Sequence, residues 1–201
     1  KPIRMLGIVQ DVTERREAEK RARIISAFLT LFARKASRKE YLQAIVRLLR
    51  HATRCRCVGI RVVDAHDYIP YEASVGFSED FLQKEGRLCL RGDVCACLRV
   101  IAGAPEPQDL PMMTPAGAFA CNNSIAFVGS LTEDEQARFR GNCMKHGFLS
   151  LGITPIRHRD TVLGAIHLAD ERPGMLPSDA TAFMEVVAPL IGEALFRFQI
   201  E

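Results

Sequence analysis

The sequence predicts an α+β domain built on an antiparallel sheet of about five or six strands. Helices near the N- and C-terminal ends are expected on one face of the sheet, and an irregular, helix-containing insert is expected to form a pocket on the other. Three observations support this prediction. Apolar residues recur at helical spacing near both ends of the chain, strand-like segments occur in adjacent pairs, and residues 86–131 have no regular pattern.

Helices are predicted where a capping pattern precedes apolar residues at helical spacing. Capping boxes at 37–40 and 132–135 predict helix starts, the second for a single helix over 132–147. The last helix, 178–199, has an apolar face wide enough to cover a sheet and to contact a second chain. The helix predicted over 12–35 has an almost entirely polar first half, which is typical of a helix that bridges domains or pairs with a partner.

Strands are predicted mainly in pairs. Residues 56–64 and 68–76 flank the turn DAHD, and residues 148–158 and 161–170 flank the turn RHRD. Each pair is therefore expected to form an antiparallel hairpin. A further short strand is predicted at 3–10.

Composition and charge exclude several classes of function. The chain of 201 residues has 27 Lys and Arg against 24 Asp and Glu, and the two signs alternate in TERREAEKRAR, so we expect a solvated helix face and no nucleic-acid partner. No apolar stretch approaches the roughly 18 residues of a membrane span, and the N-terminus lacks a signal peptide. Seven cysteines without a regular disulfide framework indicate a cytoplasmic, reduced protein. The chain does not begin with Met, so we expect it to be part of a longer protein.

Two stretches resemble known families. LGIVQDVTERREAEK resembles the closing strand of a PAS domain and the signalling helix behind it. The stretch from Ser150 to Leu195 resembles the C-terminal half of a GAF domain, in which Pro155 and Ile156 end one strand and Gly164 opens the next. Leu176 replaces an aromatic residue of that pattern. The resemblance implies two units, the end of a PAS domain with its connecting helix at 1–35 and a GAF-like sensory domain at 36–201.

A PAS domain followed by a GAF domain is typical of bacterial and archaeal sensor proteins, most often histidine kinases. The resemblance therefore implies a sensory input module that is not itself an enzyme, although the full-length protein would be a signalling enzyme such as a histidine kinase. The stimulus would be a small ligand, a metal or cluster, or a redox state in a cysteine-containing pocket. The signal would pass through homodimeric terminal helices, 12–35 and 178–199, to an output domain beyond residue 201.

Two other classes of function remain open at this point. A thiol enzyme resembling the free methionine-sulfoxide reductases would use Cys89, Cys95 and Cys121 as candidate nucleophile and resolving thiols. A purely structural dimerisation module would hold no bound species.

The stretch RGDVCACLRVIAG raises the question of whether its two cysteines bind a metal. Residues two apart on a helix point about 200° away from each other, so a helix would direct only one cysteine to the core, whereas an extended or turned segment would let both bind one metal. Four of the available ligands would suit zinc or an iron–sulfur cluster, although the familiar CxxC spacing is missing, and a cysteine-ligated haem is a further alternative. The candidate metal ligands are Cys89, Cys95, Cys97, Cys143 and His146.

A pocket wall is the second interpretation of the same cysteines. Cys55 and Cys57 are expected to be core residues of a strand, and His167 is expected to be a satisfied or half-exposed sheet residue rather than a ligand. The candidate ligand-binding residues combine thiols and aromatic rings from the insert and its flanks: Phe77, Phe81, Cys89, Cys95, Cys97, Phe119, Cys121 and Phe127.

Overall fold

The computed structural model describes residues 15–16, 18–19, 22–23, 25–31 and 37–200, and the chain divides into two compact units, Lys1–Ala36 and Ser37–Glu201. In the first unit the described residues are helical, as predicted for 12–35. The predicted strand at 3–10 lies outside the described residues, as does most of the stretch that resembles a PAS domain.

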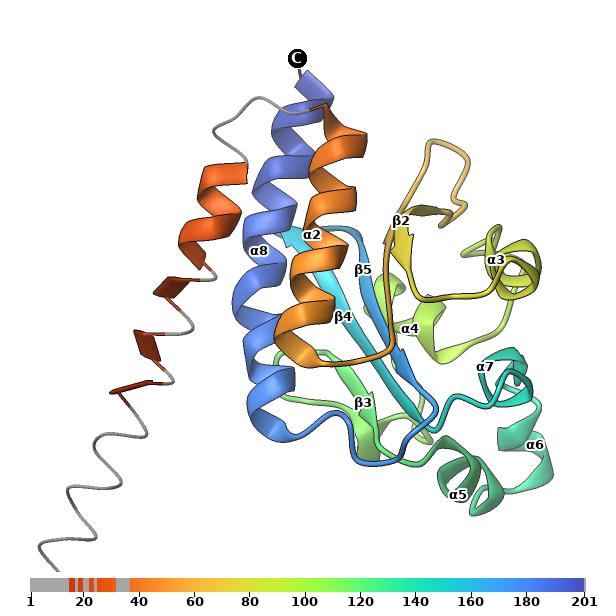
Figure 1. Cartoon of the computed structure of the whole chain (residues 1–201). Coiled ribbons are helices and arrows are strands. Elements are labelled where there is room, and N and C mark those ends of the chain that lie inside the picture. Colours follow the sequence, from red (N-terminus) through yellow and green to blue (C-terminus); the bar gives the residue numbers. More distant parts are fainter. Residues whose placement is uncertain (1–14, 17, 20–21, 24, 32–36, 201) are drawn as a thin grey trace, which may run out of the picture. The chain divides into compact units, whose positions relative to one another are not determined.

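The second unit contains a five-stranded antiparallel sheet (Figure 1). Its strands run in the spatial order β2-β1-β5-β4-β3, and every neighbouring pair is antiparallel. The strands are β1 (Cys57–Val62), β2 (Tyr71–Val75), β3 (Phe119–Cys121), β4 (Ser150–His158) and β5 (Thr161–Asp170). Both predicted hairpins, β1–β2 and β4–β5, are present, and the predicted α+β architecture is confirmed.

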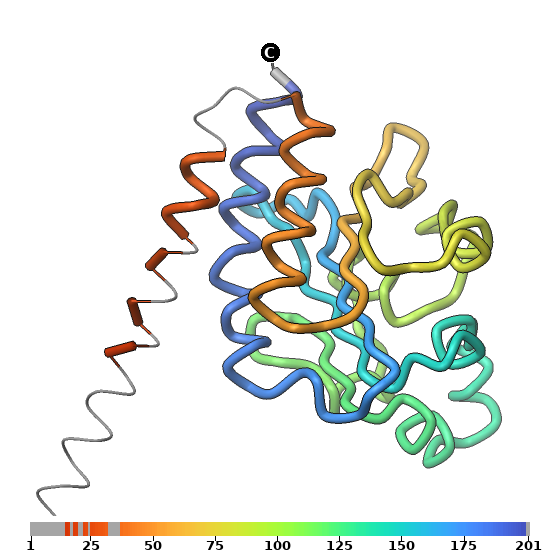
Figure 2. The backbone as a smooth tube through the Cα atoms, viewed as in Figure 1, coloured from red at the N-terminus to blue at the C-terminus, as the bar shows by residue number. Residues whose placement is uncertain are grey.

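Helices cover both faces of the sheet (Figure 1). Helix α2 (Arg38–Thr53) contacts β1 and β2, and helix α8 (Ser178–Ile200) contacts β4 and β5. The opposite face is covered by the segment 79–147, whose path from β2 to β4 can be followed in Figure 2. All six residues of β1 are buried because the strand is covered on both sides.

Local sequence explains where α2 begins and ends. Ser37 and Glu40 form the predicted capping box, in which each side chain accepts a hydrogen bond from the other residue's backbone N–H. The helix ends at Arg54, which takes a left-handed conformation with φ of 59° and donates its N–H to the carbonyl of Arg50. A stripe of apolar residues starting at Leu42 is fully buried against the sheet.

Close packing of α8 on the sheet depends on Gly192. A Cβ atom at this position would lie 2.0 Å from the carbonyl oxygen of Arg157 in β4. The absence of a side chain therefore lets the helix approach the strand, and the neighbouring Ile191 and Leu195 are fully buried.

Apart from the edge strand β3, the segment 79–147 consists of short helices joined by turns. They are α3 (Glu79–Glu85), α4 (Ala96–Ala102), the 3₁₀ helix η1 (Leu110–Met112), α5 (Ser124–Gly129), α6 (Glu133–Gln136) and α7 (Asn142–Lys145). The prediction of one helix over 132–147 is wrong, because the chain turns between α6 and α7. Gly141, which precedes α7, has φ of 74°, a conformation that favours glycine and interrupts a helix.

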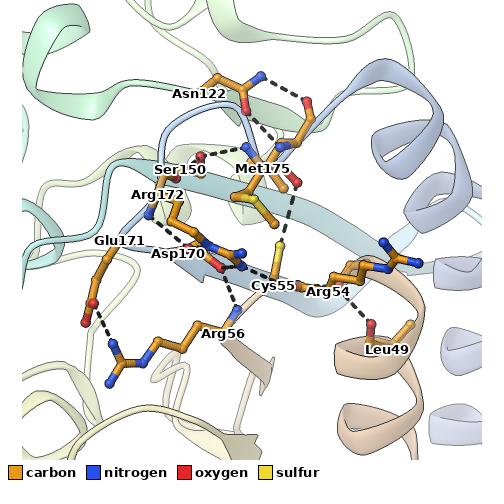
Figure 3. A network of polar contacts seen from close by, with 12 residues as sticks. Leu49, Arg54, Cys55, Arg56, Asn122, Ser150, Asp170, Glu171, Arg172 and Met175 are labelled. Carbon is orange, nitrogen blue, oxygen red and sulfur yellow. Dashed lines mark hydrogen bonds and ion pairs between the residues drawn. The ribbon is translucent and has the colours of Figure 1, made fainter.

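A polar network at one end of the sheet ties α2, β1 and β5 together (Figure 3). Asp170, the last residue of β5, is 1% exposed. Its carboxylate accepts hydrogen bonds from the backbone N–H of Arg56 and from the backbone and side chain of Arg172. Arg172 in turn donates to the carbonyl of Arg54 at the end of α2.

None of the helices in the described part of the chain is long and apolar enough to cross a membrane.

Candidate functional site

A cavity lies between the sheet and the segment 79–147. Its walls come from β1, β3, β4 and β5 on one side and from the start of α4, from α5 and from residues 139–144 on the other. Apolar atoms form most of its surface. The space between the walls is about 620 Å³ including the opening to solvent, of which about 50 Å³ remains for the centres of water-sized molecules. The cavity thus has room for a very small molecule without movement of its walls.

Arg61 forms the charged part of the sheet wall. It is the next-to-last residue of β1 and is 1% exposed. Its two terminal nitrogens each donate a 2.7 Å hydrogen bond, one to the carbonyl of Ile69 and one to the carbonyl of Glu85. The guanidinium carbon lies 3.7 Å from the centre of the Tyr71 ring. Among the described residues, Nε of Arg61 is the one enclosed side-chain nitrogen or oxygen without a hydrogen-bond partner.

Glu85 balances this charge from the opposite side. Its carboxylate is buried, lies 4.0 Å from the Arg61 guanidinium and accepts a 3.2 Å hydrogen bond from Nε of Arg140 and another from Asn142. Arg140 also pairs with Asp93 at 2.7 Å. The cluster therefore holds two guanidinium groups and two carboxylates, so its charges balance.

His167 and Tyr71 add a neutral polar pair. His167 lines the cavity from β5, is 4% exposed, and its Nδ1 lies 2.7 Å from the Tyr71 hydroxyl. Burial, helped by the nearby Arg61 charge, lowers the pKa of His167 to about 3. Burial raises the pKa of Tyr71. Both side chains are consequently neutral at pH 7. The expectation of a satisfied sheet histidine fits this position.

Cys95 and Cys97 lie together on the cavity wall. Helix α4 begins at Ala96, and Cys95 precedes it with an extended backbone, φ of −165° and ψ of 156°. Because only Cys97 is inside the helix, helical geometry does not separate the two side chains. Both cysteines line the cavity.

The thiols of the cavity differ strongly in acidity. The neighbouring Cys97 thiol lowers the pKa of Cys95, against the opposing effect of burial. The Cys95 side chain and burial raise the pKa of Cys97 well above its usual range. Burial also raises the pKa values of Cys143 and Cys121. Cys95 is thus the cavity thiol whose pKa is lowered.

Five of the eight predicted ligand-binding residues line the cavity: Cys95, Cys97, Phe119, Cys121 and Phe127. The other three, Phe77, Phe81 and Cys89, are placed elsewhere. Phe77 and Phe81 stack on each other in a neighbouring aromatic cluster with Phe148. Cys89 is half-buried and donates its backbone N–H to Asp93. Cys55 and Cys57 are both 1% exposed, as expected of core residues.

The predicted metal ligands Cys89, Cys95, Cys97, Cys143 and His146 are not brought together. Within the described residues, no group of three or more His, Cys, Asp or Glu side chains is arranged to hold a metal ion. Cys95, Cys97 and Cys143 share the cavity wall, but His146 is directed elsewhere: its ring nitrogens lie 2.8 Å from the Asn142 carbonyl and 2.9 Å from the Asp80 carboxylate.

Four polar residues of the site were missed by sequence reasoning: Arg61, Glu85, Arg140 and Asn142. One of them left a signal in the sequence. Arg61 interrupts the apolar strand VGIRVV, and a charge in a strand that is otherwise buried needs a partner. Its acidic partner, Glu85, comes from a segment 24 residues further along the chain, with no local pattern that marks it.

A sequence model of the GAF domain matches residues 37–195. The chain belongs to the GAF domain family. The residues that carried the sequence resemblance, from Ser150 to Leu195, form β4, β5 and most of α8.

Solved GAF-fold structures match the chain over nearly its whole length. A protein assigned as a GAF sensor from Burkholderia vietnamiensis is 13% identical over 92% of this chain and 98% of its own, with a TM-score of 0.65. A domain assigned to a two-component sensor histidine kinase of Sinorhizobium meliloti is 14% identical over 82% and 94%, with a TM-score of 0.56. Free methionine-R-sulfoxide reductase from Neisseria meningitidis, solved with its substrate, is 11% identical over 92% and 93%, with a TM-score of 0.67. At these identities the likeness shows the fold alone. No curated protein matches the chain significantly.

Proposed function

We propose that this GAF domain is the sensory input module of a signal-transduction protein, and that it binds a small molecule in the cavity between the sheet and the segment 79–147. The observation that carries the proposal is the cavity itself, an apolar enclosure with a few convergent polar groups on one wall. GAF domains are typical of signalling sensors, and the Burkholderia and Sinorhizobium neighbours are assigned to that class.

The chemistry of the wall suggests the kind of ligand. Arg61 and Arg140 already balance Glu85 and Asp93, so this cluster needs no further ion. The Nε–H of Arg61 has no hydrogen-bond partner, and a buried donor without a partner costs about 1–3 kcal/mol. A ligand with a hydrogen-bond acceptor would remove this cost. We therefore expect a small, uncharged or zwitterionic molecule with at least one acceptor oxygen and an apolar remainder.

The output of the sensor would be a change in helix packing. The cavity wall includes strands β4 and β5, whose other face carries α8. A ligand that binds one arrangement of the sheet and helices more tightly than another shifts the population between them. In the full-length protein, terminal helices of two copies would pass this shift to an output domain, as in a sensor histidine kinase.

A thiol enzyme is the second candidate function, and one observation favours it. The pKa of Cys95 on the cavity wall is lowered, which favours the thiolate form that acts as a nucleophile. The roles first considered for Cys121 and Cys89 gain no support, because burial raises the pKa of Cys121 and Cys89 lies outside the cavity. Turnover of free methionine sulfoxide with a dithiol reductant, lost in Cys95→Ser, would establish this alternative in place of the sensor.

The sensor proposal is tested by ligand binding with a matched pair of variants on helix α5. Val128 lines the cavity, whereas Ile125, three residues earlier, is 58% exposed. A compound present at 100 times its Kd stabilises the protein by about 2.7 kcal/mol. In a thermal-shift screen of small metabolites, we expect a compound that raises the Tm of wild type and Ile125→Trp but not of Val128→Trp. Equal shifts in both variants would place binding outside the cavity and contradict the proposal.

A further inference from the structure

We propose that Cys95 and Cys97 form a reversible disulfide when a hydroperoxide enters the cavity, so that the wall of the site is itself a redox switch. The covalent step does not depend on a ligand. Its regulatory meaning rests on the function proposed above, because the disulfide would change the surface that a ligand contacts.

The backbone holds the two cysteines at a suitable distance for a disulfide. The separation of their Cα atoms is set by the φ and ψ angles of the residue between them, Ala96, which is helical. Helical geometry places Cα atoms two residues apart at about 5.4 Å. This value falls within the range of roughly 4.4–6.8 Å that disulfides span.

The side chains also face the same space. Both residues line the cavity. The extended conformation of Cys95 allows this, since two cysteines inside the helix would point about 200° apart. The disulfide would form within the first turn of α4.

The two cysteines have complementary roles. The pKa of Cys95 is lowered and that of Cys97 is raised, so Cys95 forms a thiolate more readily. Burial also raises the pKa values of the remaining cavity thiols, Cys121 and Cys143. Oxidation therefore begins at Cys95, and Cys97, two residues further along the chain, is the second thiol.

The reaction balances in two steps. The Cys95 thiolate attacks one oxygen of hydrogen peroxide, the O–O bond breaks, and the departing hydroxide takes a proton from solvent to form water, which leaves Cys95 as a sulfenic acid. The Cys97 sulfur then attacks the Cys95 sulfur. The S–O bond breaks, and the second hydroxide leaves as water with the proton of the Cys97 thiol. Two electrons pass from the sulfur atoms to the peroxide, and a dithiol reductant reverses the change.

The size of the cavity fits a small oxidant. About 50 Å³ is open to the centres of water-sized molecules, which is enough for hydrogen peroxide to reach the wall. Helix α4 contacts β3, β4 and β5, so a change at its first turn acts directly on the sheet.

The sequence supplies a direct test by peptide mapping. Trypsin cleaves after Arg91 and Arg99, so that Cys95 and Cys97 share the peptide 92–99, whereas Cys143 lies on the peptide 141–145. After treatment of the wild-type protein with hydrogen peroxide and alkylation of the free thiols, we expect peptide 92–99 to be unalkylated and lighter by about 2 Da, the two hydrogens lost on disulfide formation. Dithiothreitol should restore the alkylated form.

Control variants separate this switch from general oxidation. Cys95→Ser and Cys97→Ser should each abolish the mass loss, and Cys143→Ser should leave it unchanged. A cross-linked pair of peptides 92–99 and 141–145, a sulfinic acid at Cys95, or an unaltered peptide 92–99 in wild type would each overturn the proposal. Because the mapping uses no ligand, these outcomes are independent of the thermal-shift screen that tests the sensor function.

Discussion

Replacement of Asp170 by Asn should destabilise the domain more than any exposed charge substitution. Asp170 is 1% exposed at the end of β5, where its carboxylate holds the backbone of Arg56 and both the backbone and the guanidinium of Arg172 (Figure 3). An Asn side chain has the same shape but no charge, and its NH₂ group would face the N–H donors of Arg56 and Arg172. The variant therefore removes the charge while leaving the packing almost unchanged.

The expected size of the effect follows from the ionisation of this group. Burial alone would raise the pKa of Asp170, but the hydrogen bonds from Arg172 and Arg56 outweigh it and lower the pKa from 3.8 to about 2. A depression of this size corresponds to about 2.5 kcal/mol of stabilisation. Because the Arg172 side chain is 61% exposed, solvent screens part of this, and we expect Asp170→Asn to lose about 2 kcal/mol at pH 7.

Urea unfolding at a series of pH values tests both the size and the origin of this effect. The unfolded state binds a proton at a higher pH than the folded state, so the stabilisation is complete above about pH 5 and is lost as the pH falls towards 2. This part of the pH dependence should be absent in Asp170→Asn. Asp160→Asn, in the exposed β4–β5 turn, should change the free energy of unfolding by less than about 0.5 kcal/mol. A loss in Asp170→Asn no larger than in this control would refute the reasoning.

Three further substitutions test the packing around the site by urea unfolding. The lowered pKa of His167 means that the free energy of unfolding of wild type falls by about 2 kcal/mol between pH 6.5 and pH 5, because only the unfolded state binds the proton. His167→Gln should remove this pH dependence. The same fall in the variant as in wild type would contradict the reasoning. Gly192→Ala should cost about 1–3 kcal/mol because its Cβ would overlap the Arg157 carbonyl, whereas Gly129→Ala, with open space around it, should be near neutral; equal effects would disprove the close approach of α8. Phe81→Ala should cost about 3–5 kcal/mol through loss of the fully buried ring, and a cost below about 1 kcal/mol would show that the aromatic cluster is not part of the core.

The fold was predictable from the sequence because its main elements follow local rules. The capping box at Ser37 and the apolar stripe after it define α2. The turn sequences between strands give both hairpins, and the apolar face that follows Ser178 gives α8. The single helix predicted over 132–147 is wrong because it includes Gly141. The positive φ of this residue is set by the path of the chain between α6 and α7.

The site was only partly predictable, since its residues are far apart in the chain. Cys95, Cys97 and Cys121 were identified as wall residues from their position in the irregular segment, and they line the cavity. The sequence could not show that Phe77 and Phe81 lie outside the cavity wall, because an aromatic ring fits a core and a pocket wall equally well.

The sequence by itself determined the α+β class, the antiparallel hairpins, the capped terminal helices and the resemblance to the GAF family, all of which depend on residues near one another in the chain. Only the tertiary structure decided that Arg61, Glu85 and Arg140 form one cluster and that Cys95, which lies outside α4, lines the same cavity as Cys97. The physical reason lies in how the segment 79–147 is held in place. Its path is set by long-range packing and by the need to satisfy a buried guanidinium, and neither leaves a periodic pattern in the sequence.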